Sequence, residues 1–468
     1  MKRNKTLIFF LAGALLAGLT ACTGNKSKTK ESEKMKKEYP VTLMTLEPGH
    51  FHAALVQKSM YDEVNPTAYV YAPKGPELES FLAFIKQFNS RPGNPTSWNE
   101  VVYDQPDYLE KMLSEKPGNV VVLSGNNARK TEYILKAVEA GLNVYADKPM
   151  VITPAAYPEL AKAFDTAKEK GLLLYDIMTE RFEITAMLQR ELARIPSLFG
   201  ELQKGTPDNP SLIQESIHRF YKNVAGKPLV RPAWFFDVAQ QGEGIVDVET
   251  HLVDLIMWGA FPETVIRKED VKITGARRWT TDLSPEQFGT VTGLKEWPAF
   301  LKKYVDGGLL KVYSNGAITF EINGIFARAS VEWTYHTPER SDTHYSLMRG
   351  TGCDLVISQK EKEDYHPTLY IKAAPGNDLK RFAGELDRVM TEVITPKYPG
   401  VAVEKIADDT WKVIIPEKYD VGHEAHFGQV TENYLDYLLH GNMPAWEVPN
   451  MITKYWITTE GLKEAMMR

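Results

Sequence analysis

Short apolar runs alternate with helix-like runs up to about residue 180, and this alternation constrains the fold more than any other feature of the chain. The helix-like runs repeat apolar residues at spacings of three and four, as in Leu160, Ala163, Phe164 and Ala167. Strands that alternate with helices in this way form a mostly parallel sheet covered on both faces. The expected strands are 41–46, 67–72, 101–103, 119–124, 143–146 and 172–176.

The stretch 141–150 places one lysine at the edge of that sheet where ligands bind. Gly141 suits the left-handed position that closes a helix, and Val144 and Tyr145 favour a strand. Pro149 cannot donate to a sheet, so the strand ends before it and leaves Lys148 at its carboxyl end. A lysine in that place can be desolvated and can move protons. The alternative is an exposed lysine that merely ends a strand.

After about residue 181 the pattern changes to longer strand-like runs, at 310–313, 317–322, 327–335, 346–348 and 355–358. The dipeptide Asn315-Gly316 lies between two of these runs and is a strong hairpin-turn signal. These features predict a second domain built on a mainly antiparallel sheet. The segments 425–439 and 450–467 return to a helical pattern.

A second group of chemically active residues lies in the segment 242–254. On a helix, Asp247 and His251 would be four residues apart on one face, with Asp254 three residues further on. A carboxylate and an imidazole within reach of each other can orient a substrate hydroxyl and take its proton, since the imidazole pKa lies near neutrality. The alternative is a helix N-terminus capped by Asp247, with His251 in a structural role.

The first 25 residues have the order of an export signal. A basic start precedes an apolar run that is too short to span a bilayer comfortably, and Leu19-Thr20-Ala21-Cys22 follows. This order resembles the bacterial lipobox, so we expect a lipoprotein signal peptide at 1–22, lipidation of Cys22 and a flexible tether at 23–39. Such a protein would be anchored to a bacterial membrane and would face the periplasm. A plain signal peptide or an uncleaved anchor is the alternative.

Charge and cysteine content argue against two other classes of protein. The net charge of -6 at pH 7 does not favour a nucleic-acid surface. With Cys22 lipidated, Cys353 would have no partner, which argues against a disulfide-stapled fold and predicts a buried, inert thiol. No metal site is expected either, because His423 and His426 do not form the H-E-x-x-H zinc pattern.

Both chemical motifs resemble signatures of the glucose–fructose oxidoreductase, inositol dehydrogenase and MocA (Gfo/Idh/MocA) family. The family stretch A-G-x-x-V-x-x-E-K-P, with aspartate for glutamate, is matched at Ala140, Gly141, Val144, Asp147, Lys148 and Pro149. The stretch G-G-G-x-x-x-D-x-G-x-H-x-x-D is matched at Gly242, Asp247, His251 and Asp254. The resemblance covers 41–468. It implies an α/β Rossmann-type domain with a parallel sheet at 40–178. It further implies an α+β substrate and oligomerisation domain at 179–468, built on a large, mainly antiparallel open sheet.

The resemblance also implies roles for individual residues. Lys148 assists proton movement at the reacting carbon, His251 is the general base and Asp247 holds a neighbouring hydroxyl, while a nicotinamide takes the hydride. Arg181 is expected beside the substrate. Trp234 begins an aromatic run, 234–236, which is either a surface on which a sugar ring stacks beside the substrate or, as is more common for such runs, part of the core. The expected cofactor contacts are Glu47, Gly49, His50, Phe51, Lys74, Ser124, Asn126, Asn127, Asp147 and Lys148.

The turn after the first strand departs from the family pattern G-x-G-x-x-G. An alignment on His52 puts Gly49 at the third glycine but Met44 and Leu46 at the first two. Side chains there would obstruct the approach of the backbone to a pyrophosphate, so either the turn is built differently or cofactor binding is altered. The acid expected after the second strand for the ribose is absent and Lys74 lies near its place, which leaves NAD and NADP both open.

Export conflicts with the use of a soluble pool of nicotinamide cofactor. We therefore expect a tightly held NAD or NADP that one substrate reduces and another reoxidises, since retention over many turnovers requires very slow dissociation. The sequence predicts an NAD(P)-dependent oxidoreductase acting on a secondary hydroxyl of a sugar or glycoside, and a homo-oligomer is expected from the resemblance. Two alternatives stay open: an NAD-dependent glycosidase that oxidises C3 transiently, and a non-catalytic sugar- or partner-binding lipoprotein.

Overall fold

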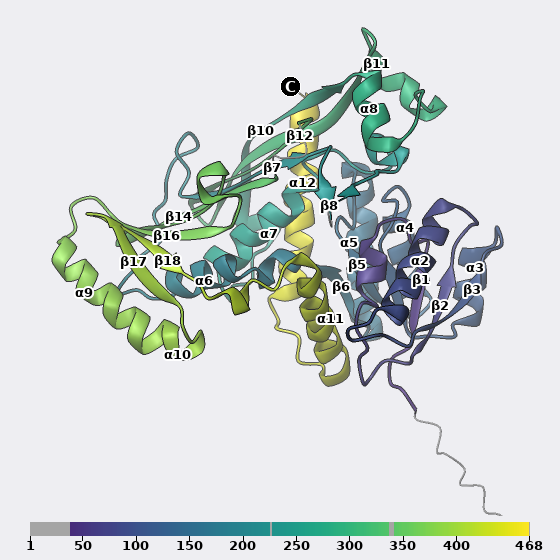
Figure 1. The fold of residues 1–468 in the computed structure, drawn as a ribbon, viewed down its shortest axis with the longest axis horizontal. Helices are drawn as coiled ribbons and strands as arrows, with labels where there is room; N and C mark the ends of the chain where they lie inside the picture. Colours follow the sequence, from purple (N-terminus) through teal and green to yellow (C-terminus); the bar gives the residue numbers. More distant parts are fainter. Residues whose placement is uncertain (1–37, 225–226, 337–340, 468) are drawn as a thin grey trace, which may run out of the picture. The chain divides into compact units, whose positions relative to one another are not determined.

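The structure of the protein, a computed structural model, describes residues 38–224, 227–336 and 341–467. The expected signal peptide, its Cys22 and most of the expected tether lie outside these residues. The chain from Tyr39 to Arg468 forms one unit, organised by two sheets (Figure 1). Within the described part, no helix has both the length and the apolar character that crossing a membrane requires.

The first sheet has six parallel strands in the order β3-β2-β1-β4-β5-β6, which is the order of a Rossmann fold. This confirms the predicted parallel sheet. The chain order reverses between β1 and β4, so the carboxyl ends of these strands define the usual ligand edge. The strands are β1 (Leu43–Leu46), β2 (Thr67–Tyr71), β3 (Asn99–Tyr103), β4 (Val120–Leu123), β5 (Asn143–Asp147) and β6 (Leu174–Ile177). The helices between them are α1 (His52–Leu55), α2 (Pro76–Ser90), α3 (Tyr108–Glu115), α4 (Lys130–Glu139) and α5 (Tyr157–Lys170).

The C-terminal helices α11 (His423–His440) and α12 (Glu447–Met467) return to this first sheet. On α11, the Tyr434 ring stacks on that of Tyr145 with 4.4 Å between ring centroids, and Thr431 Oγ1 lies 3.2 Å from the Tyr145 hydroxyl. Both tyrosines are almost fully buried, so the end of the chain contributes to the first core. The domain boundary expected at 178/179 stays a prediction, and α11 and α12, from beyond that boundary, pack against the core of the first sheet.

The second sheet has ten strands, of which nine follow the order β10-β12-β13-β7-β14-β15-β16-β18-β17, while β11 pairs with β12. The pairing of β13 with β7 is parallel and the others are antiparallel, which confirms the predicted mainly antiparallel sheet. The strands are β7 (Leu212–Arg219), β10 (Val271–Leu283), β11 (Val305–Asp306), β12 (Leu309–Ile322), β13 (Ile325–Thr334), β14 (Thr343–Arg349), β15 (Cys353–Gln359), β16 (Thr368–Ala373), β17 (Ala402–Ala407) and β18 (Thr410–Ile414). A separate two-stranded hairpin consists of β8 (Asn223–Val224) and β9 (Lys227–Pro228).

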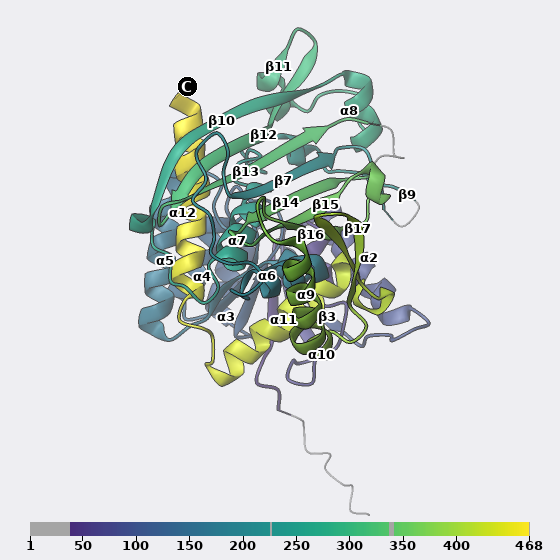
Figure 2. The same ribbon diagram turned by 90° about the vertical axis from the view of Figure 1, so that its left-hand side faces the viewer.

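Helices α6 (Ile184–Ala193), α7 (Glu249–Ala260) and α12 pack against one face of this sheet, between it and the first sheet (Figure 1). In Figure 2, which is turned by 90°, the strands β10, β12, β13 and β7 follow one another from the top downward and α7 lies below them. The apolar residues of α7 face the sheet core, and the start of the helix points toward the ligand edge of the first sheet. The remaining helices are α8 (Pro285–Thr292), α9 (Leu379–Val389) and α10 (Thr395–Lys397).

The hairpin predicted at Asn315-Gly316 is wrong, because β12 runs straight through this dipeptide. The Asn315 side chain bonds to the Trp333 amide and to Thr281, and a Cβ on Gly316 would lie 2.2 Å from Ile245. The glycine therefore allows the segment before α7 to approach the strand. The β12–β13 turn lies instead at 323–324, where an Asn-Gly pair has φ values of 50° and 84°.

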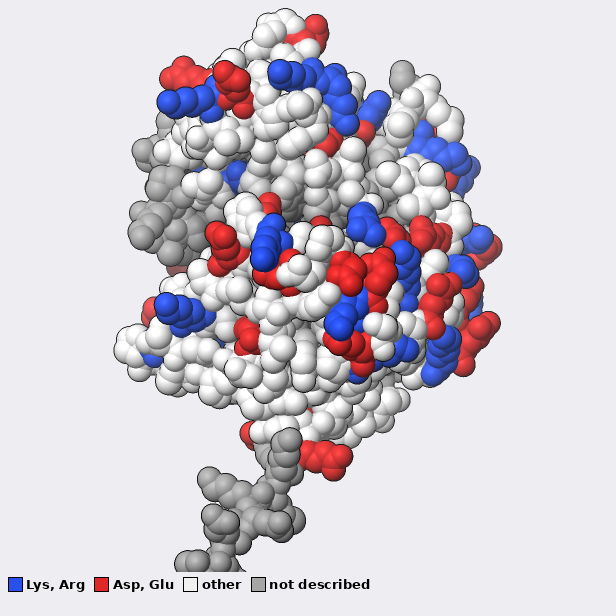
Figure 3. Space-filling model, turned by 90° about the vertical axis from the view of Figure 1, so that its right-hand side faces the viewer, with Lys and Arg blue, Asp and Glu red and all other residues white. Residues whose placement is uncertain are grey.

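Two expectations from composition concern the distribution of charge on the surface and the thiol of Cys353. On the face shown in Figure 3, the Lys and Arg side chains lie among Asp and Glu side chains rather than in one basic stripe. Cys353 is buried and free, which confirms the prediction of a buried thiol. Burial raises the pKa of this thiol to about 12, so it is protonated and unreactive at neutral pH.

Candidate active site

The two sequence motifs meet at the carboxyl end of β5. Pro149 ends this strand, and the Lys148 side chain leaves the sheet there to donate to Asp247 Oδ1 at 2.7 Å. The second carboxylate oxygen of Asp247 accepts from Gln241 Nε2 at 2.9 Å. The side chains of Lys148 and Asp247 are only 13% and 8% exposed, so the ion pair is largely shielded from water.

His251 lies in the first turn of α7 and carries a buried Nδ1 that has no hydrogen-bond partner within the described part of the chain. Burial holds the pKa of His251 well below its usual range, and the positive charge of Lys148 lowers it further. The imidazole is therefore neutral at pH 7 and can accept a proton. Asp247 does not share a helical face with it as predicted, because α7 begins at Glu249 and Asp247 lies in the preceding turn.

Asp147, which stands where the family has glutamate, is the centre of a second cluster at the same edge. Its Oδ2 accepts from Ser124 Oγ at 2.9 Å and lies 2.9 Å from His52 Nδ1, while Lys130 Nζ donates to its backbone oxygen at 3.0 Å. Burial alone would raise the pKa of Asp147, but the facing His52 and Lys130 hold it well below its usual range. Asp147 is thus a buried carboxylate that stays ionised.

The turn between β1 and α1 is built differently from a glycine-rich turn. The amides of Gly49 and His50 both donate to the Ser124 carbonyl, at 3.1 Å and 3.3 Å. The Glu47 carboxylate accepts from the Tyr133 hydroxyl and, at 3.1 Å, from the Tyr108 hydroxyl. The polar groups of this turn are therefore satisfied by the protein itself.

The loop after β4 contacts the segment that precedes α7. Asn126 Nδ2 donates to Gln240 Oε1 at 2.7 Å, and Asn127 Nδ2 donates to the Gln241 carbonyl at 2.8 Å. Trp234 lies in the same segment and is only 9% exposed. Its indole bonds to Glu77 on α2, and a Cβ on Gly49 would lie 3.6 Å from it. The structure therefore places Trp234 against α2 and the β1–α1 turn, largely buried, rather than as an open surface for a sugar ring.

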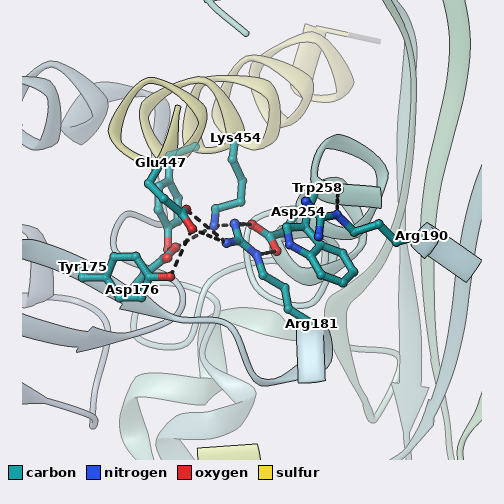
Figure 4. Close-up of polar contacts among 9 residues, drawn as sticks. Tyr175, Asp176, Arg181, Arg190, Asp254, Trp258, Glu447 and Lys454 are labelled. Atoms are coloured by element: carbon teal, nitrogen blue, oxygen red, sulfur yellow. Dashed lines mark hydrogen bonds and ion pairs between the residues drawn. The ribbon is translucent and has the colours of Figure 1, made fainter. Parts of the chain in front are cut away.

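Arg181 was expected beside the substrate, but the structure engages its guanidinium in a buried ion network (Figure 4). It donates to both carboxylate oxygens of Asp254 at 2.7 Å and to both of Glu447 at 3.0 Å. Lys454 on α12 joins the network, with its Nζ 2.8 Å from Asp254 and 2.7 Å from Asp176. These bonds use four of the five guanidinium N–H groups, so Arg181 chiefly connects structural elements.

Two of the expected cofactor residues lie at the surface. The Lys74 side chain is 73% exposed, and its Nζ lies 3.6 Å from Asp104, which partly neutralises the positive charge proposed for a 2′-phosphate. Phe51 is 37% exposed and contacts the rings of His50 and His52.

Sequence reasoning missed several residues of this region. His52 served only to align the turn, although His50 lies two residues before it and histidine is the commonest metal ligand. His423 lies beside it, with 5.4 Å between the ring centroids, but the two residues are far apart in the sequence. Lys130 is 3% exposed, and burial lowers its pKa to about 8, yet its sequence context is that of an ordinary helix start.

Comparisons with known proteins agree with this architecture. The family "Oxidoreductase family, NAD-binding Rossmann fold" matches residues 68–175, and "Putative oxidoreductase C terminal domain" matches residues 188–466. A protein of Parabacteroides merdae ATCC 43184, described as a putative oxidoreductase, is 53% identical over 91% of this chain and 98% of its own, with a TM-score of 0.89. No functionally curated protein matches the chain.

More distant structures share the fold. A levoglucosan dehydrogenase in complex with NADH is 12% identical over 91% of this chain and 97% of its own, with a TM-score of 0.59. GenD2 from gentamicin A biosynthesis, in complex with NAD, is 14% identical over 92% of this chain and 95% of its own, with a TM-score of 0.55. At these identities the likeness concerns the fold.

The family implies a nicotinamide dinucleotide, and the residues of the ligand edge can be tested against it. At one end the fit is good, because the Lys148–Asp247 ion pair lies at the ligand edge, and the Lys148 charge acts on His251, whose Nδ1 is unpartnered in the described structure. At the other end, the amides of Gly49 and His50 are bonded to a carbonyl and are not free for a pyrophosphate. The family match also begins at residue 68, after this turn. The chain thus keeps the nicotinamide end of the site and rebuilds the pyrophosphate end.

Proposed function

Because the chain belongs to the Gfo/Idh/MocA family of oxidoreductases with an NAD-binding Rossmann domain, we propose that it converts a secondary hydroxyl of a sugar or glycoside into a ketone, or catalyses the reverse reaction. The cofactor is a tightly held NAD or NADP, which when bound supplies the hydride acceptor. The enzyme is anchored outside the cytoplasm through a lipid on Cys22 and works as a homo-oligomer.

One observation carries the proposal: Lys148 from the first sheet and Asp247 from the segment before α7 form a shielded ion pair with a 2.7 Å contact. A reacting hydroxyl that enters here would accept from the Lys148 ammonium and donate to His251, while a neighbouring substrate hydroxyl would donate to the Asp247 carboxylate. The ammonium then stabilises the alkoxide that develops as the hydroxyl proton leaves, and shielding from water strengthens this interaction.

His251 is the group that we assign to take the proton. Its imidazole is neutral, its Nδ1 is unpartnered in the described structure, and it lies in the first turn of α7, four residues after Asp247. A neutral imidazole at a hydroxyl gives general-base catalysis, which contributes typically 10²–10⁴-fold to a rate. A sugar substrate is supported by the distant relative whose structure contains levoglucosan with NADH.

A second candidate function is binding of a sugar or a protein partner without turnover. The observation that favours it is the rebuilt turn, in which the amides of Gly49 and His50 bond to Ser124. The two candidates differ in one measurable property, since only the enzyme requires a dinucleotide.

The test begins with the protein purified from its native host, denatured by heat, and mass spectrometry of the released small molecules. The proposal predicts NAD or NADP close to one per chain. Incubation of the same preparation with a panel of glycosides should yield a keto-glycoside. Release of an aglycone without net oxidation would instead identify the NAD-dependent glycosidase, and absence of any dinucleotide and any product would identify the binding protein.

The residue assignments are tested with His251→Gln and Lys148→Met. Each should lower kcat by about 10²-fold or more while the circular dichroism spectrum stays unchanged, and His251→Gln should also keep the content of bound dinucleotide. Lys162→Met is the matched control, because Lys162 is 61% exposed and pairs only with a surface glutamate. Full turnover by both site variants would refute the assignment.

A further inference from the structure

Three metal-ligand side chains converge where the family normally has its glycine-rich turn. His50 and His52 come from the connection between β1 and α1, and Asp147 comes from the end of β5. One potential ligand atom from each lies within 4.8 Å of the other two. Asp147 Oδ2 is 2.9 Å from His52 Nδ1 and 4.0 Å from His50 Nδ1.

We propose that His50, His52 and Asp147 bind a divalent first-row transition metal ion, best Zn²⁺. Two imidazoles and one carboxylate are a ligand set that such ions prefer over Mg²⁺ or Ca²⁺. Ligand atoms about 2.0–2.1 Å from a tetrahedral Zn²⁺ lie about 3.4 Å apart. The two separations from Asp147 Oδ2, 2.9 Å and 4.0 Å, bracket that value, so small side-chain rotations form the site.

One neighbouring group holds a ligand in this orientation, as outer partners do in metal sites: Ser124 Oγ donates to Asp147 Oδ2 at 2.9 Å. The His52 amide donates to His50 Nδ1 at 3.4 Å, and this long contact would be given up when Nδ1 binds an ion. The side chains of His52 and Asp147 are 12% and 7% exposed, while that of His50 is 32% exposed, which gives an ion a path from solvent.

Two cations lie near the site and weaken its affinity for a metal, but neither is unpaired. Lys148 bonds to the Asp247 carboxylate, and Lys130 bonds to the Asp147 backbone oxygen. The carboxylate of Asp147 therefore remains the negative group that faces the two imidazoles.

Three protein ligands leave one tetrahedral position open, which is the arrangement of zinc sites that bind water or substrate rather than of closed structural sites. Lys148 follows Asp147 in the chain, so the open position would belong to the same region as the proposed active site. In a glycine-rich turn, free backbone N–H groups supply positive charge at this edge. In this protein those N–H groups are bonded, and the metal ion would supply the positive charge instead.

The test is a metal titration of the full chain after treatment with a chelator and dialysis. Isothermal calorimetry with Zn²⁺, and visible absorption with Co²⁺ as a tetrahedral probe, should each report one ion per chain. Ser124→Ala removes an outer partner and should weaken Zn²⁺ binding by roughly 10–100-fold. His50→Ala, His52→Ala and Asp147→Asn each remove a ligand and should weaken Zn²⁺ binding by more than that.

His440→Ala is the matched control, because His440 is an exposed histidine on α11 that pairs only within its own segment. It should bind Zn²⁺ as the unaltered protein does. Zn²⁺ should also raise the thermal midpoint of the unaltered protein and not that of His50→Ala, a readout that separates lost binding from lost folding. The proposal is overturned if the unaltered protein does not bind Zn²⁺, or if His50→Ala and His52→Ala bind Zn²⁺ as tightly as the unaltered protein does. No turnover is measured, so this result and the test of the proposed function are independent.

Discussion

Lys454 is the side chain whose loss should destabilise the fold most clearly. It is 1% exposed, and its ammonium lies 2.7 Å from Asp176 of β6 and 2.8 Å from Asp254 of α7 (Figure 4). Replacement by methionine keeps most of the volume but leaves two buried carboxylates without their shared cation. Removal of one partner from a buried ion pair costs about 3–5 kcal/mol.

This cost translates into a shift of the thermal midpoint. Unfolding entropy of about 2.1 cal/mol/K per residue gives about 0.9 kcal/mol/K for a unit of about 430 residues, so Lys454→Met should lower the midpoint by about 3–6 °C. Differential scanning calorimetry measures it. Lys463→Met is the control on the same helix, because the side chain of Lys463 is 48% exposed and its contact with Glu460 is worth less than about 0.5 kcal/mol.

The loss should also depend on pH with a definite sign. Burial would raise the pKa of Asp254, but Arg181 and Lys454 hold it well below its usual range. The stability that Asp254 contributes is thus present above its unfolded pKa of about 3.9 and is lost as pH falls through the folded value. In Lys454→Met the carboxylate is protonated more easily, so the difference from the unaltered protein should narrow toward pH 4. A midpoint within 1 °C of the Lys463→Met control at pH 7 would refute this account of the network.

Three further predictions concern other buried groups. Burial raises the pKa of the fully buried Glu249 well above its usual range, so the stability of the protein falls as pH rises through that pKa. In urea titrations, Glu249→Gln should therefore be more stable than the unaltered protein by about 1–3 kcal/mol at pH 8 but not at pH 4. Equal gains at both pH values would contradict this. Because the pKa of His251 lies well below 6.5, the acid limb of a kcat/KM profile should fall below that pH, and a limb at or above it would exclude His251 as the base. Gly125→Ala should destabilise the protein and displace the β1–α1 turn, because the new Cβ would lie 2.3 Å from the Glu47 carbonyl. Gly384→Ala is the control: it lies on α9 with open space around it and should stabilise the protein by about 0.5–1 kcal/mol in the same calorimetric scan.

The parallel sheet was predictable because its central strands, such as β1 and β4, are buried on both faces and therefore appear as near-continuous apolar runs. The end of β5 was also predictable from the local sequence, because Pro149 cannot donate a hydrogen bond to the sheet. The position of Lys148 followed from these two facts and needed no knowledge of distant contacts.

The failures came from tertiary contacts that short patterns do not contain. Asn315-Gly316 has the composition of a turn, but Ile245, which packs against Gly316, is distant in sequence. Arg181 resembles a substrate ligand in the sequence, but in the structure Asp254 and Glu447 accept four bonds from its guanidinium. In each case the deciding partner is more than 60 residues away, so local propensity was overridden by packing or charge pairing.

The altered turn was recognised from its missing glycines, but its chemistry was not. The sequence showed His50 and His52 beside each other, while only the fold brings Asp147 to them from another strand. Parallel sheets gather such residues at one edge, so a prediction that had combined the ends of β1 and β5 would have found the cluster.

The central claim is that Lys148 and His251 act on the same reacting hydroxyl, and a double-mutant cycle on kcat/KM tests it most directly. With the best glycoside from the panel, Lys148→Met, His251→Gln and the double variant are compared with the unaltered protein. The account predicts strong non-additivity, with the double variant little slower than the slower single variant, because either change alone disables one transition state. Losses that multiply independently would show that the two side chains do not work at one centre, and would contradict the account.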